Sequence, residues 1–70
     1  MAEEAMEELT RFIDNAVLAG LPSVRIVHGK GEGILRRETQ LFLRQNPNIE
    51  RFRDGEAAEG GHGVTIAYLK

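Results

Sequence analysis

The sequence predicts a small α/β domain, a two-layer sandwich with the element order α-β-α-β-β and a mixed sheet. Two segments carry apolar residues at steps of three and four, the period of an amphipathic helix, and three shorter apolar segments read as strands. Glycine or proline stands at most boundaries between them. Seventy residues allow one domain, residues 1–70, which buries only about 60% of its unfolded surface and so has a thin margin of stability.

The first helix should run from Ala2 to Ala19. Glutamates crowd its first half, where they complement the positive end of the helix dipole. Gly20 fits a C-terminal cap, and Pro22 prevents the helix from continuing. The apolar stripe of this helix consists of Ala5, Met6, Leu9, Phe12, Ile13, Ala16 and Val17.

A strand should follow from Ser23 to His28, and a second helix should run from about Gly33 to Asn46, where Pro47 ends it. We expect the buried stripe of this helix to consist of Ile34, Leu35, Leu41 and Phe42, with Leu43 at its margin. The side chains left for solvent or a partner are then Arg36, Arg37, Gln40 and Arg44.

The remaining two strands follow a clear pattern. Residues Ile49–Arg53 alternate apolar and charged side chains, as on an edge strand, whereas Gly63–Leu69 is the most continuously apolar strand and should lie centrally. The polar loop Asp54–Gly61 joins them. The first two strands then form a right-handed parallel unit around the second helix, with the third strand antiparallel between them. This arrangement brings Gly60–Gly63 beside His28, at the sheet edge where ligand sites of α/β proteins collect.

The loop Gly29–Gly33 is the most informative feature of the chain. Such a loop presents backbone N–H groups at a helix N-terminus, where the partial positive charge favours an anion, above all phosphate. Lys30 adds a full positive charge, and His28 adds a side chain of the type that exchanges protons near neutral pH. We predict phosphate or nucleic-acid contacts from Gly29, Lys30, Gly31, Gly33, Arg36, Arg37 and His62, and catalytic proton transfer by His28. The alternative is that the glycines only form a tight turn and that His62 is only a loop residue.

Several other kinds of site are excluded. Ile34 stands where a dinucleotide fingerprint needs its third glycine, and the G-K-[ST] pair of a P-loop is absent. The single serine, Ser23, begins a strand, which leaves no support for a Ser/His/Asp triad. Without cysteine there is no disulfide, thiol nucleophile or thiolate metal site. The acids lie mainly on the first helix, so no protein metal site is evident, and whether a divalent metal is required stays open. With no signal-peptide pattern or membrane-length apolar run, the default is a cytoplasmic domain.

Net charge is −2, which argues against a nucleic-acid binder until the charges are located. Residues 1–20 carry five acids and one base, residues 21–53 carry seven bases and three acids, and residues 54–70 carry three acids and one base. A local basic face can bind a phosphate backbone although the whole chain is acidic. On charge alone, an ordinary solvated face remains the simpler interpretation.

These motifs, in this order, resemble those of the Smr (small MutS-related) domain. The resemblance is to the Smr domain at the C-terminus of the bacterial MutS paralogue that does not serve in mismatch repair. The resemblance covers essentially the whole chain. The matching segments are His28-Gly29-Lys30-Gly31, Gly33-x-Leu35-Arg36, Pro47 with the short strand after it, and Gly60-Gly61-His62-Gly63-Val64-Thr65.

The resemblance implies a fold similar to the C-terminal domain of the bacterial third translation initiation factor. It also implies a nuclease that nicks duplex or branched DNA or cleaves RNA on stalled ribosomes. Parent proteins of this kind have an ATPase core, dimerise, and are linked to suppression of homologous recombination or to rescue of collided ribosomes. We therefore predict a nucleic-acid endonuclease domain, with DNA, RNA or the ribosome as partners and no membrane. Two alternatives stay open: a binding module without chemistry, and an assembly role in which a free sheet edge pairs with a second copy.

Two departures from the family pattern matter. The family's L-D-L-R-G or L-D-L-H-G strand precedes the first helix, and this chain begins after it, so we expect a fragment that lacks the usual first strand. If the charged residues of that motif contribute to cleavage, the fragment binds nucleic acid but cuts poorly or not at all. Glu32 stands where small or hydroxyl residues are commoner, and it would oppose a bound anion unless its side chain points outward.

Overall fold

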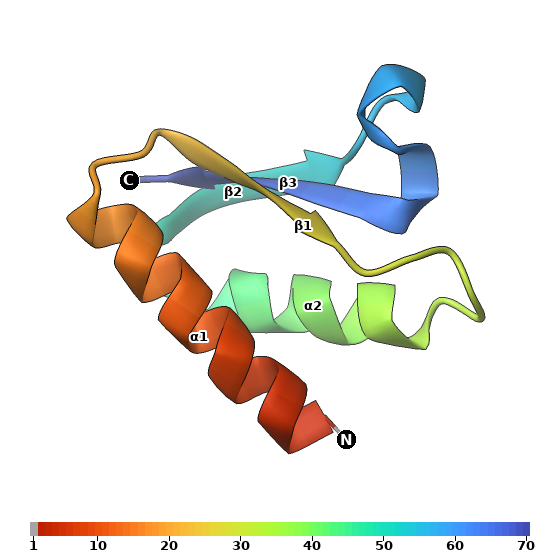
Figure 1. Cartoon of the computed structure of the whole chain (residues 1–70), viewed down its shortest axis with the longest axis horizontal. Coiled ribbons are helices and arrows are strands. Elements are labelled where there is room, and N and C mark those ends of the chain that lie inside the picture. Colours follow the sequence, from red (N-terminus) through yellow and green to blue (C-terminus); the bar gives the residue numbers. More distant parts are fainter. Residues whose placement is uncertain (1) are drawn as a thin grey trace.

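The computed structural model describes residues 2–70 (Figure 1). Every predicted helix and strand is confirmed, and no end differs from its expected position by more than one residue. The polar loop between the last two strands contains two short 3-10 turns, Ala57–Glu59 and Gly61–Gly63. The elements are α1 (Ala2–Leu18), β1 (Ser23–Val27), α2 (Ile34–Gln45), β2 (Ile49–Asp54) and β3 (Val64–Leu69).

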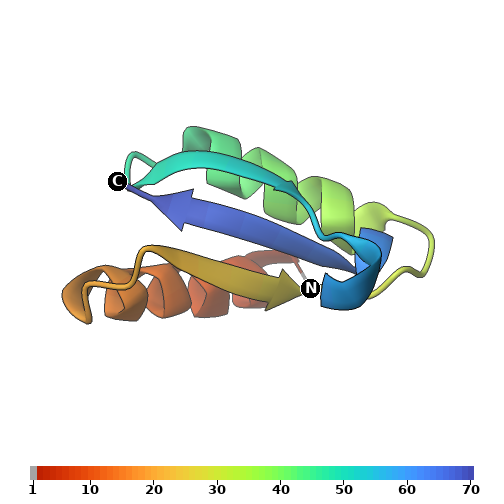
Figure 2. The ribbon, with the colours of Figure 1, turned by 90° about the horizontal axis from the view of Figure 1, so that it is seen from above.

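The three strands form one sheet in the order β1-β3-β2, and both helices cover the same face of it, which makes two layers (Figures 1 and 2). The prediction of a central third strand, antiparallel to both neighbours, is confirmed. The prediction of a mixed sheet is wrong. Strands β1 and β2 point the same way, but β3 separates them, so every hydrogen-bonded pair of strands is antiparallel.

The core lies between the helices and the sheet. The central strand β3 is buried along almost its whole length, as its continuous apolar run predicts. α1 contributes the residues at its helical spacing, whereas the strands contribute alternate positions. The buried core residues are Leu9, Ile13, Ala16, Val24, Leu43, Ile49, Ala67 and Leu69.

Helix α2 packs on the sheet through a different face from the predicted one. Leu43, expected at the margin, is 1% exposed, whereas Leu41, expected in the core, is 46% exposed. Ile34 and Leu35 are also exposed, and Phe42 alone of the predicted stripe packs against the core. The face on the sheet follows helical spacing through Arg36, Thr39, Gln40 and Leu43. Because this face is largely polar, hydrophobic periodicity pointed to the wrong stripe.

Phe12, predicted to be a core residue, is 45% exposed. It lines a cavity of about 440 Å³ between the first half of α1, the end of β1 and the first half of α2. The cavity exists because α1 crosses beneath β1 and its N-terminal half runs away from the sheet (Figure 1). In the part of the chain that the structure describes, no helix is long and apolar enough to span a membrane.

Candidate active site

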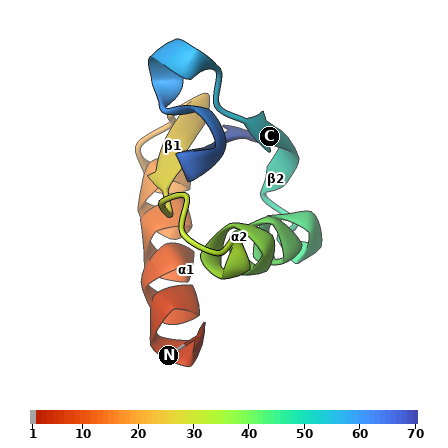
Figure 3. The same ribbon diagram turned by 90° about the vertical axis from the view of Figure 1, so that its right-hand side faces the viewer.

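The loop Gly29–Gly33 leaves the end of β1 and turns back toward the helical layer, where it opens α2 (Figure 3). Gly29 and Gly33 have φ angles of 81° and 83°, in the left-handed region that other residues rarely adopt. Between residues 2 and 70, no backbone carbonyl accepts a hydrogen bond from the amides of residues 30–33. Helix α2 also has neither a side-chain cap nor an acidic residue in its first turn. Within the described residues, neither these amides nor the positive end of the α2 dipole has an anionic partner from the helix.

The turn that precedes β3 lies beside this loop, as the sequence predicts. The backbone amides of His28 and Gly29 both donate to the Gly63 carbonyl, each at 3.0 Å. Gly63 is buried, and a Cβ there would lie 3.3 Å from Cγ of Lys30, so the aliphatic stem of Lys30 rests on this glycine. The start of β3 thus holds both His28 and Lys30 at the carboxyl end of β1.

His28 is half-buried and connects the loop to the interior of the domain. Its Nε2 lies 2.8 Å from Oγ1 of Thr65, and its Nδ1 lies 3.0 Å from the carbonyl oxygen of Gly29. A carbonyl only accepts, so these contacts assign the proton of the neutral ring to Nδ1, while the Thr65 hydroxyl donates to Nε2. Since Thr65 is fully buried, Nε2 faces inward and Nδ1 is the nitrogen on the loop side.

A polar network continues from Thr65 across the face of α2. Gln40 Nε2 donates to Oγ1 of Thr65 at 3.2 Å and to Oδ1 of Asp54 at 3.0 Å. Arg36 holds the same carboxylate with two bonds, from Nε at 3.0 Å and from Nη2 at 2.7 Å. Nδ1 of His62 lies 3.5 Å from the other oxygen, Oδ2. The network therefore joins the two histidines that the sequence singles out, and it explains why a polar face of α2 can be buried.

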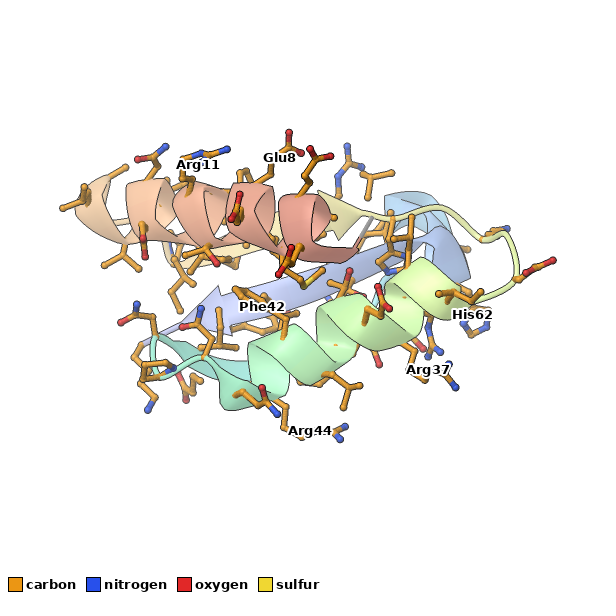
Figure 4. The ribbon with its side chains drawn as sticks, turned by 90° about the horizontal axis from the view of Figure 1, so that it is seen from below. Glu8, Arg11, Arg37, Phe42, Arg44 and His62 are labelled. Atoms are coloured by element: carbon orange, nitrogen blue, oxygen red, sulfur yellow. The ribbon has the colours of Figure 1, made fainter. Side chains whose placement is uncertain are left out.

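The other predicted site residues surround this network and differ in their exposure and in their hydrogen-bond partners. The Arg36 side chain is 36% exposed but is held by Asp54, so its guanidinium is fixed rather than free. Arg37, Lys30 and Glu32 are exposed, and Glu32 lines a pocket of about 160 Å³ formed by residues 28–35. The His62 side chain is 80% exposed, and Figure 4 places it beyond the first turn of α2.

Sequence reasoning missed three members of the network: Asp54, Gln40 and Thr65. Asp54 was assigned to the loop after β2, but it is the last residue of that strand. Thr65 is the one aliphatic hydroxyl in the apolar run 64–69, and Gln40 follows Arg36 by one helical turn. The threonine in the predicted central strand could have indicated this network, because a buried hydroxyl requires a hydrogen-bond partner.

Two carboxylates have lowered pKa values: Asp54 at the end of β2 and Glu59 in the turn before β3. Hydrogen bonds from Arg36, with a smaller contribution from Gln40, lower the pKa of Asp54 to about 2. The guanidinium of Arg53 donates two hydrogen bonds to Glu59 and lowers the pKa of that carboxyl to about 2. Both groups therefore stay ionised in the folded domain at pH values where an unfolded chain is protonated.

Stability should fall as the pH drops through this interval. The ordinary pKa values are 3.8 for Asp54 and 4.5 for Glu59, so the unfolded chain binds more protons than the folded one between these values and about 2. The stabilisation is complete above about pH 5 and disappears toward about pH 2. Urea unfolding midpoints measured across this range check the prediction. The Asp54→Asn variant should lose less stability on acidification than the parent, and equal losses would contradict the assignment.

A metal centre built from protein ligands is not visible in residues 2–70, where no group of three His, Cys, Asp or Glu side chains could hold a metal ion. The acids of α1 lie on exposed positions of that helix, and Asp54 is engaged by Arg36 and Gln40. The polar groups gathered at the end of β1 are thus a histidine, a lysine and backbone amides, which can bind an anion and move a proton.

The model of the Smr domain family matches residues 1–70. The chain belongs to the Smr domain family. The Smr domain of Thermus thermophilus MutS2 superposes on it with a TM-score of 0.95 and 38% identity, over 100% of this chain and 88% of that one. A stand-alone small MutS-related protein from Escherichia coli, YdaL, superposes with a TM-score of 0.93 and 26% identity, over 100% of this chain and 58% of that one.

Among whole proteins, this Smr domain is 53% identical over 70 residues to a protein of Symbiobacterium thermophilum named endonuclease MutS2. It is 47% identical over 68 residues to a putative endonuclease MutS2 of Bacillus subtilis. The matches cover 100% and 97% of this chain, but only 9% of each relative. The family and the fold follow from these matches, and they agree with the resemblance carried by the H-G-K-G loop.

Proposed function

We propose that this Smr domain cleaves phosphodiester bonds in nucleic acid at the carboxyl end of β1. One observation carries the proposal: a buried hydrogen-bonded network backs His28, which stands beside Lys30 and a loop whose amides 30–33 have no backbone acceptor among residues 2–70. The relatives that share half of its residues are named endonucleases, which supports the same reaction class. DNA nicking is the leading activity, and RNA cleavage is the second form of the same chemistry.

The roles of the residues follow from what hydrolysis of a phosphodiester needs. A water oxygen forms a bond to phosphorus as the ester P–O bond breaks in line with it. The amides of residues 30–33 and the ammonium of Lys30 stabilise the charge on the nonbridging oxygens. His28 acts in its doubly protonated form: it gives the proton on Nδ1 to the departing oxygen and keeps the one on Nε2, while the attacking water loses its proton to solvent or to His62.

Thr65 suits this proton transfer because a hydroxyl both donates and accepts. When His28 is protonated, Nε2–H donates to Oγ1 of Thr65, and it continues to do so after Nδ1 has released its proton. Gln40 donates to the same oxygen at 3.2 Å and keeps it in place. Thr65 and Gln40 are therefore positioning residues, and Thr65 is too deeply buried to touch a substrate.

A second candidate function is binding of DNA, RNA or a ribosome without chemistry. It is favoured by the state of Asp54, whose two oxygens are engaged by Arg36 and Gln40, so the carboxylate of the network does not offer a free second acid or base. The roles in recombination and ribosome rescue that the family resemblance implies belong to a parent protein, and they remain predictions.

Incubation of the chain with supercoiled plasmid and with structured RNA, with and without EDTA, tests the proposal. A version extended upstream by the L-D-L-R-G-type strand should be tested beside it. Conversion of supercoiled to open-circular plasmid by the 70-residue chain supports cleavage by the loop alone. Nicking by the extended form alone assigns part of the active site to that strand and makes this chain a binding module. No cutting by either form, with any metal supplied, rejects the proposal.

A further inference from the structure

A polar groove of about 230 Å³ runs along the flank of α2 that faces away from α1. Gly33 lines both this groove and the pocket of residues 28–35, so the groove begins where the candidate active site ends. Three of its lining side chains are arginines, and none is acidic. The lining residues are Gly33, Arg36, Arg37, Gln40, Leu41 and Arg44.

The positive charge of the groove is available to a partner. Arg37 and Arg44 are exposed, and neither forms an ion pair with any residue that the structure describes. They are seven positions apart, which is two helical turns or about 10 Å along the helix. Figure 4 shows both on the same flank of α2, with His62 beyond its first turn. The positive charge that Lys30 gives the loop therefore continues along α2 through Arg37 and Arg44.

Among the residues that the structure describes, none that lines the groove has a ring on which a base could stack. The exposed aromatic side chain Phe12 opens into the cavity between α1 and α2 instead. The half-buried ring of Phe52 lies under Arg44, whose guanidinium carbon is 5.9 Å from the ring centroid. Proteins that bind single strands use such rings as stacking platforms, whereas a duplex presents its phosphates with the bases paired inside. Leu41, 46% exposed, adds an uncharged surface suited to a sugar.

We propose that this groove binds the sugar–phosphate backbone of a double-stranded segment next to the bond held at the loop. The inference rests on the proposed function and adds to it a contact surface outside the loop: the flank of α2 holds the backbone of the same duplex by charge. Arg37 and Arg44 each contact a phosphate, and Arg36, fixed by Asp54, sets the position of the backbone where the groove meets the loop.

The salt dependence of binding tests this inference. A short fluorescent duplex and its isolated single strand are titrated with the parent chain and with Arg37→Gln, Arg44→Gln and Arg11→Gln, at a series of salt concentrations. Arg11 is an exposed arginine on α1, away from the groove, so its variant makes the same change of charge elsewhere (Figure 4). Each groove variant should reduce the slope of log Kd against log salt by about 0.9, whereas Arg11→Gln should leave it unchanged.

Two results would overturn the inference: an unchanged slope in Arg44→Gln, or tighter binding of the single strand than of the duplex by the parent chain. The outcome is separable from that of the nuclease proposal. If the groove variants reduce the slope of log Kd against log salt but the parent chain never nicks plasmid, the result supports binding in the groove and rejects cleavage. If the parent chain nicks plasmid but its groove variants keep the parent salt dependence of Kd, the result rejects binding in the groove and leaves the cleavage proposal standing.

Discussion

Replacing His28 with alanine should abolish nicking by this Smr domain while leaving it folded. Loss of a positioned proton donor typically lowers a rate by about 10²–10⁴-fold, which would put nicking below detection. The fold should survive because His28 is half-buried, its backbone amide still donates to Gly63, and Gln40 still bonds the Thr65 hydroxyl. The initial rate of plasmid nicking, together with the circular dichroism spectrum of the variant, checks both parts.

Thr65 provides the matched control for this result. Thr65→Val removes the hydroxyl with little change of volume, so it should lower the nicking rate less than His28→Ala and alter how the rate depends on pH. Thr65→Ser keeps the hydroxyl and should restore the parent profile. A His28→Ala chain that nicks as fast as its parent, both freed of contaminating nuclease, would remove His28 from the chemistry.

Replacing Leu43 with alanine should cost about 2–5 kcal/mol of stability, the usual cost of removing a fully buried leucine side chain. Leu43 is 1% exposed and belongs to the core cluster. A domain of this length has a total stability of roughly 4–10 kcal/mol, so the variant should lose a large fraction of its stability. Urea unfolding followed by circular dichroism measures the difference.

Leu41 on the same helix supplies the comparison. It is 46% exposed, so Leu41→Ala should change the unfolding free energy by less than about 1 kcal/mol. The two variants make the same chemical change two positions apart, and only the face of α2 differs. A larger loss of stability in Leu41→Ala than in Leu43→Ala would mean that the helix packs through the face that hydrophobic periodicity suggests.

The elements and the central position of β3 could be predicted because they depend on local patterns. The stripe of α1 follows the helical period, and the run 64–69 is apolar at almost every position, as expected for a strand with neighbours on both sides. The pairing of the strands followed from that placement. Describing the sheet as mixed was wrong because two strands that point the same way are parallel neighbours only when nothing lies between them.

The face of α2 and the network behind His28 could not be predicted in the same way. Hydrophobic patterns assume that a buried face is apolar, whereas Arg36 and Gln40 turn toward the sheet because Asp54 and Thr65 satisfy their hydrogen bonds. These partners lie between 14 and 25 positions away in the sequence, so only the fold brings them together. The His28 loop was recognisable because its glycines, lysine and histidine are contiguous.

An amide-resolved NMR titration shows where on this domain a phosphodiester binds. The labelled chain is titrated with a short phosphorothioate duplex that resists cleavage. We predict that the signals of the amides of residues 29–33 and of the His28 imidazole shift at the lowest additions, followed by the amides along the groove of α2. Shifts confined to the region of Arg25 and Arg51 on the edge strands, with residues 29–33 unmoved, would contradict it.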